Sequence, residues 1–234
     1  MKKHALKLGV SVVMLLTSGL ALGEEKGFEA ESHQWRMKAV MTCGMLRDPK
    51  ALDPSKVLTA LGDIDKEWAA ISGKYLNSPP KEYASDPLWK AYFEDLSDNV
   101  VVVRERVEKK QYRLAQKNCS QFCMTFSRMH QTNGVSTLTD QLFGWRMGMN
   151  GAQDMMNAGN AQGAKASLDA LGKMRDGLQR QLALPANAKL ADLQKPVMAA
   201  YDVWAAAMNA GDAKKAGAAF MDFMGVFPKL FMAS

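Results

Sequence analysis

Sulfur and imidazole side chains gather in one short stretch of the chain, from Cys119 to His130. Cys119, Cys123 and His130 are separated by steps of four and seven residues, which place side chains on one face of a helix. Met124 follows Cys123 directly. Thiolate and thioether groups select soft metal ions such as Cu(I). The stretch therefore indicates metal or cofactor chemistry, and no pair of carboxylates suggests acid–base catalysis.

A second stripe of the same kind begins at His33 and continues with three methionines at intervals of four residues. In an up-and-down helical bundle the first and fourth helices are antiparallel neighbours. That arrangement brings the start of this stripe beside the end of the first stretch, and Cys43 level with Cys119. The expected corner holds His33, Met37, Met41, Cys43, Cys119, Cys123 and His130.

Ordinary structural roles also account for parts of this pattern. Methionines at helical spacing are common core residues, because the thioether side chain is apolar and flexible. A histidine near the end of a helix, such as His130, interacts favourably with the helix dipole. Both roles are open alternatives to metal binding.

The rest of the chain predicts a helical protein. Alternating β-branched patterns are almost absent, and turn signals such as Asp53-Pro54 and Asn133-Gly134 recur at helical intervals. The third and fourth helices could be continuous, because no breaker separates Val100 from Lys117. The expected helices cover residues 30–47, 54–76, 87–108, 110–131, 138–158, 161–183, 189–209 and 212–231.

The two halves of the chain resemble each other. Trp35-Arg36-Met37 recurs as Trp145-Arg146-Met147, and Leu58-Thr59-Ala60-Leu61-Gly62 recurs as Leu168-Asp169-Ala170-Leu171-Gly172. The second copy starts 110 positions after the first in both cases, at 145 against 35 and at 168 against 58. Each half offers four helices with short connections. We expect an all-α protein of two tandem antiparallel four-helix bundles, residues 24–132 and 133–234. One fused eight-helix domain is the alternative.

The N-terminal segment predicts export to the periplasm. Residues 1–23 combine lysines, a short apolar run and small residues before Glu24, which is the pattern of a cleaved signal peptide. We expect no further stretch long and apolar enough to span a membrane. Removing three lysines lowers the formal net charge from +6 to +3. No basic cluster with interleaved aromatic residues is present, so nucleic acid is not an expected partner.

Several motifs in the first half resemble the cytochrome c-prime family of periplasmic four-helix bundles. Arg36 and Met37 or Met41 match the start of its first helix, and residues 86–93 (Asp-Pro-Leu-Trp-Lys-Ala-Tyr-Phe) match the opening of its third. Cys119 and Cys123 match the haem attachment segment of its fourth helix. The resemblance covers roughly residues 30–131. It implies a covalently bound haem c, electron transfer and a periplasmic redox partner.

The attachment segment departs from the family pattern. The family has Cys-x-x-Cys-His, whereas this chain has Cys-x-x-x-Cys-Met. The added residue turns the second thiol by about 100° around the helix. The resemblance then implies thioether bonds from Cys119 and Cys123, with Met124, His130 or His33 as the iron ligand. The second half contains no cysteine and cannot attach haem covalently.

Three functions therefore remain open. The first is a cytochrome-like haem protein with an atypical attachment site. The second is a haem-free bundle that binds Cu(I) at the cysteine, methionine and histidine corner. The third is a haem-free structural or partner-binding bundle. None of the three makes an enzyme the expected function.

The bonding state of the three cysteines distinguishes these functions. Cys119 and Cys123 lie four residues apart on one helix, where side chains run parallel and do not converge on a disulfide. Without haem, we expect Cys43 and Cys119 to form the disulfide, because they belong to neighbouring antiparallel helices at the same level. Cys123 is then the free thiol. With haem attached, Cys43 is the unpaired cysteine.

Overall fold

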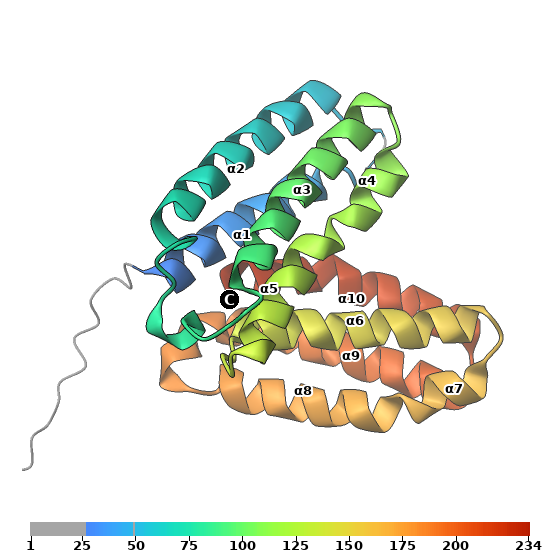
Figure 1. Cartoon of the computed structure of the whole chain (residues 1–234). Helices are drawn as coiled ribbons and strands as arrows, with labels where there is room; N and C mark the ends of the chain where they lie inside the picture. Colours follow the sequence, from blue (N-terminus) through green and yellow to red (C-terminus); the bar gives the residue numbers. More distant parts are fainter. Residues whose placement is uncertain (1–26, 49) are drawn as a thin grey trace, which may run out of the picture.

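The structure is a computed structural model that describes residues 27–48 and 50–234. The prediction of an all-helical protein is confirmed: the described residues form ten α-helices and two short 3₁₀ helices, with no strand among them. The expected signal peptide, residues 1–23, lies outside the described part of the chain. The helices fall into two groups that follow one another in the sequence (Figure 1).

The first group packs around a core rich in aromatic side chains. Trp35 and Trp68 lie at its centre, with ring centroids 4.7 Å apart. Their indole N–H groups donate hydrogen bonds to the carbonyl oxygens of Ile64 and Phe93, at 2.6 and 3.1 Å. Both buried indole N–H groups are thus satisfied. Its elements are α1 (Phe28–Gly44), α2 (Pro54–Tyr75), η1 (Lys81–Tyr83), α3 (Trp89–Glu108), α4 (Tyr112–Asn118) and α5 (Ser120–Thr132).

The second group has a core of its own. Trp145 and Trp204 are fully buried there, and Trp145 packs edge-on against Phe223 at 5.5 Å between ring centroids. The indole of Trp204 donates a hydrogen bond to the side chain of Gln153, at 2.9 Å. The elements are α6 (Leu138–Asn157), α7 (Ala161–Ala166), α8 (Leu168–Leu182), η2 (Pro185–Leu190), α9 (Ala191–Ala210) and α10 (Ala213–Ala233).

The two groups lie against each other with their long axes in different directions (Figure 1). The contact includes α5 packed against α6 and the ion pair between Arg36 of α1 and Asp140 of α6. Met37 and Cys123 extend from the first group into the apolar cluster of the second. The contact is therefore apolar as well as ionic, and the functional candidates lie along it.

The structure divides two of the expected helices and keeps the third and fourth apart. The third and fourth are separate, because the chain turns at Lys110, whose φ of 56° lies in the left-handed region. The helix expected over 110–131 is divided at Cys119 into α4 and α5. The helix expected over 161–183 is divided at Ser167 into α7 and α8. The breaks carry no glycine or proline, so no turn signal marked them.

The expectation that no further stretch is apolar enough to span a membrane stays a prediction. Among the described residues, α10 alone has the length and composition to do so. This is weak grounds for a membrane span, because core helices of soluble proteins pass the same test. Phe223, Phe227 and Leu230 of α10 are buried inside the second group.

Candidate functional site

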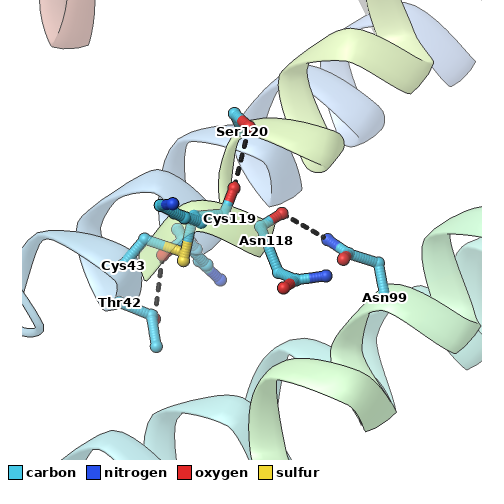
Figure 2. Close-up of a disulfide and its surroundings, with 8 residues drawn as sticks. Thr42, Cys43, Asn99, Asn118, Cys119 and Ser120 are labelled. Atoms are coloured by element: carbon cyan, nitrogen blue, oxygen red, sulfur yellow. Dashed lines mark hydrogen bonds between the residues drawn. A yellow bond between two sulfur atoms is a disulfide. The ribbon is translucent and has the colours of Figure 1, made fainter. Parts of the chain in front are cut away.

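A disulfide links Cys43, near the end of α1, to Cys119, at the junction of α4 and α5 (Figure 2). The Cα atoms are 5.9 Å apart and the bond closes a separation of 76 residues. The pairing expected for the haem-free protein is confirmed, and Cys123 is a free, buried thiol. At the helix junction, the side-chain amide of Asn99 on α3 donates a hydrogen bond to the carbonyl oxygen of Asn118, at 3.3 Å.

A cavity of about 540 Å³ opens beside this disulfide. Side chains from α1, α4, α5, α6 and α10 line it, so both helix groups contribute to its wall. Much of the wall is apolar and sulfur-rich, with Met147, Met224, Phe227 and Phe231 among its members. Cys123 lines the same cavity. This volume is the size of a binding pocket for a small molecule.

The charged groups of the cavity are all positive. Arg47, Arg113, Lys117 and Arg146 line it, and its described lining contains no aspartate or glutamate. Arg47, Arg113 and Lys117 are exposed, whereas Arg146 is half-buried. These side chains therefore give the largely apolar cavity a positive electrostatic potential.

Arg146 is the most unusual of these cations. Burial lowers its pKa from the ordinary value, against the opposing influence of Cys123. No aspartate or glutamate of the described chain forms an ion pair with it, and the one hydrogen bond of its side chain goes to the sulfur of Met147, at 3.7 Å. Its guanidinium also lies over the ring of Phe143, 5.5 Å from the centroid. A half-buried cation without a counter-ion is the natural partner of a bound anion.

Arg36 occupies the corresponding place in the first copy of the Trp-Arg-Met motif, and its surroundings differ. It is only 2% exposed, and its Nη1 lies 2.7 Å from Oδ1 of Asp140 in the first turn of α6. The same carboxylate accepts hydrogen bonds from Ser127 and Thr137, at 2.8 and 2.5 Å. Arg36 therefore has an internal counter-ion, whereas Arg146 has none.

His130 completes this ionic cluster. Its Nδ1 lies 2.5 Å from Oδ2 of Asp140, and its Nε2 lies 3.3 Å from Oε2 of Glu29. Burial opposes the charged form of His130, but its hydrogen bond to Asp140 and the negative charges of Asp140 and Glu29 outweigh burial and raise its pKa to about 9. Burial also acts against the Asp140 carboxylate, but His130 and Arg36 hold its pKa well below the ordinary value. At neutral pH the cluster holds charged pairs.

The residues expected in one corner are thus divided between two places. Cys123 and His130 share a face of α5, but seven residues at 1.5 Å each separate them by about 10.5 Å along the axis. The cavity contains Met41, Cys43, Cys119 and Cys123. A separate small pocket contains His33 and His130, together with Arg36. The structure therefore does not bring the seven residues of the expected corner into one site.

The expected methionine ligands are also dispersed. Met37 is buried between the helix groups, while Met41 is 59% exposed at the cavity edge. A strict four-residue row drifts by about 40° per step around a helix, so its members cannot all face one site. Met124 is 43% exposed and does not line the cavity.

The residues do not fit a covalently attached haem c. Cys119 is bonded to Cys43 and has no thiol to form a thioether. Met124 is 43% exposed and lies outside the cavity lining, and both ring nitrogens of His130 face carboxylates. A set of three or more His, Cys, Asp or Glu side chains placed to hold a metal ion is likewise absent from the part of the chain that the structure describes.

Two important residues were not identified from the sequence. Asp140 lies in the first turn of α6, where Thr137 is the cap, and its carboxylate is the counter-ion of Arg36. Arg146 was noted only as part of the repeat. The repeat itself was the available signal, since it places two arginines in equivalent positions.

Comparison of the chain with protein-family models, with curated proteins and with solved structures found no match.

Proposed function

We propose that this protein binds a small apolar molecule carrying an anionic group, in the cavity between its two helix groups. One observation carries the proposal: four cationic side chains and no acidic one line a largely apolar chamber of about 540 Å³. Methionine, phenylalanine and proline side chains would bury the apolar part of the ligand. Burial of apolar surface contributes roughly 25 cal/mol per Å².

Arg146 would bind the anionic group. It is half-buried and lacks a carboxylate partner in the described chain, so an anion there would meet a cation that is already partly desolvated. Charge-assisted hydrogen bonds to arginine are about twice as strong as neutral ones, and the planar guanidinium binds carboxylates or sulfonates through two nitrogens. The exposed Arg47, Arg113 and Lys117 would attract the ligand to the mouth.

Binding of Cu(I) is the second candidate, because the cavity is lined by the Cys123 thiol and several thioethers. The positive side chains around the same cavity repel a cation, which makes an anionic ligand the better match. Addition of Cu(I) with measurement of bound copper distinguishes the two candidates.

We also infer the domain organisation and the cellular compartment of the protein. The repeated motifs and the two separate cores support two antiparallel four-helix bundles in tandem. The disulfide and the signal-like N-terminal segment support a role outside the cytoplasm, because disulfides persist in oxidising compartments.

The test compares two fluorescent probes of similar shape and different charge. 8-Anilinonaphthalene-1-sulfonate is anionic, and N-phenyl-1-naphthylamine is its neutral analogue. We expect the anionic probe to bind, and Arg146→Gln to raise its Kd about 10-fold, which corresponds to about 1.4 kcal/mol. Binding of the neutral probe should change little.

The matched control is Arg180→Gln, which removes the same charge from an exposed position on α8 outside the cavity. It should leave both Kd values unchanged. Equal binding of the anionic probe to wild type and Arg146→Gln would refute the role of Arg146. Failure of wild type to bind either probe would refute the cavity as a binding site.

A further inference from the structure

Cys123 is a free thiol on the wall of the cavity. It lies on α5, one helical turn after Cys119, and is 4% exposed. Its nearest potential disulfide partner is already bonded to Cys43. The parallel direction of side chains four residues apart also disfavours exchange between Cys123 and Cys119. A reagent for Cys123 must therefore come from the cavity.

Two arginines, one from each helix group, lie near this thiol. Burial acts against the charge of Arg36, but Cys123 and Asp140 raise its pKa above the ordinary value. Cys123 also favours the charged form of Arg146, and both residues line the cavity. Both arginines lie over the ring of Phe143, with guanidinium carbons 5.9 Å (Arg36) and 5.5 Å (Arg146) from its centroid.

The guanidinium of Arg36 has nitrogen atoms that can still donate hydrogen bonds. It is 2% exposed, and while Nη1 pairs with Asp140, Nε and Nη2 have no hydrogen-bond partner in the described structure. Buried donors without partners are rare in proteins, and these two nitrogens remain able to donate to a thiolate at Cys123. Neighbouring cations stabilise a thiolate, which is the nucleophilic form of cysteine.

We propose that Cys123 is a covalent modification site for small anionic disulfides that enter the cavity. The Cys123 thiolate attacks one sulfur of the reagent and forms a mixed disulfide, while the other sulfur leaves as a thiolate. The thiol proton of Cys123 passes to solvent. No further oxidant is needed, because the incoming disulfide is reduced as Cys123 is oxidised. Arg146 and the cations at the mouth select the negative charge of the reagent, so this inference rests in part on the proposed function.

The experiment uses the full exported protein with its disulfide intact and two aromatic disulfides. 5,5′-Dithiobis(2-nitrobenzoate) carries two carboxylates, and 4,4′-dithiodipyridine is neutral at pH 7.5. Each releases a coloured thiolate or thione, so the rate is followed by absorbance. The rates are divided by those for free cysteine, which removes the intrinsic difference between the reagents. Intact and peptide mass spectrometry locates the adduct.

We expect one adduct, on Cys123, and a normalised preference of about 10-fold for the anionic reagent. Arg146→Gln should abolish most of this preference, while Arg146→Lys should retain part of it. Arg180→Gln should not alter it. Prior addition of 8-anilinonaphthalene-1-sulfonate should slow the reaction, and Cys123→Ser should show none.

Equal normalised rates for the two reagents in wild type, or an adduct at Cys43 or Cys119 in place of Cys123, would overturn the proposal. Circular dichroism of each variant ensures that only folded proteins are compared.

Probe binding by Cys123→Ser keeps the two proposals distinct. If this variant still binds the anionic probe and wild type gives no adduct, the modification site is wrong and the binding function stands. If the anionic preference is observed without probe binding, the non-covalent function is wrong.

Discussion

The Nη1 atom of Arg36 lies 2.7 Å from Oδ1 of Asp140, a residue 104 positions further along the chain. This pair connects α1 of the first helix group to α6 of the second. Both side chains are largely buried, with exposed fractions of 2% and 13%. The pair also gives Arg36 an internal counter-ion, which Arg146, at the matching position of the repeated motif, lacks in the described structure.

Removal of the Asp140 charge should destabilise the protein strongly. Asp140→Asn leaves the guanidinium of Arg36 buried without a counter-ion, and breaking a buried pair costs about 3–5 kcal/mol. We expect a loss of this order in the free energy of unfolding, measured by urea denaturation. The control is Asp169→Asn, whose carboxylate is 79% exposed beside Lys173. Its effect should be below about 0.5 kcal/mol. Similar losses in the two variants would contradict the assignment.

The stability of the protein should fall between pH 6.5 and 9. The pKa of His130 is raised from an ordinary 6.5 to about 9, so its contribution is complete below pH 6.5 and is lost as the pH rises through 9. The full contribution is about 3 kcal/mol. Asp140 acts in the opposite range: its pKa is depressed, so its contribution is present above pH 3.8 and is lost as the pH falls below that value.

Urea denaturation at a series of pH values measures this dependence. The His130→Gln variant lacks the titrating group and should lose most of the slope between pH 6.5 and 9. The substitution His33→Gln is the matched control, because His33 lines the same small pocket but forms no ion pair in the described structure. A wild-type slope that persists in His130→Gln would assign the pH dependence to another group.

The disulfide should stabilise the folded chain. In the chain-entropy description, a bond that closes about 76 residues contributes around 4 kcal/mol. We expect Cys43→Ser/Cys119→Ser to lose a large part of this amount. Cys123→Ser leaves the bond intact and should lose much less. Peptide mapping without reductant should recover Cys43 joined to Cys119. Recovery of Cys119 joined to Cys123 would show that the pairing is wrong.

Lys110 stands where glycine would be favoured. Its φ of 56° lies in the left-handed region, which costs a residue with a Cβ atom about 1–2 kcal/mol. Lys110→Gly should therefore raise the free energy of unfolding by about 0.5–1 kcal/mol, after the entropy of glycine in the unfolded chain is included. The control is Lys66→Gly, at an exposed position inside α2, which should lower it by about 1 kcal/mol.

The sequence alone was sufficient for the helical class, and it predicted the pairing of Cys43 with Cys119 for a haem-free protein. Helices are local structures, since their hydrogen bonds join residues four apart and their caps and breakers lie nearby. The cysteine pairing followed from two simple facts, the parallel side chains of Cys119 and Cys123 and the antiparallel order of neighbouring helices. The repeated Trp-Arg-Met motif was also visible without coordinates.

Tertiary structure decided where the chemistry lies. The break at Cys119 carries no local turn signal, and it is accompanied by contacts from Asn99 and Cys43 on other helices. Cys123 and His130 are already about 10.5 Å apart along α5, and the tertiary packing places Cys123 in the cavity and His130 beside Asp140. Likewise, only the packing of α1 against α6 gives Arg36 a carboxylate and leaves Arg146 without one. A charge acquires its role from neighbours that are distant in the sequence, because electrostatic interactions and burial depend on position in space.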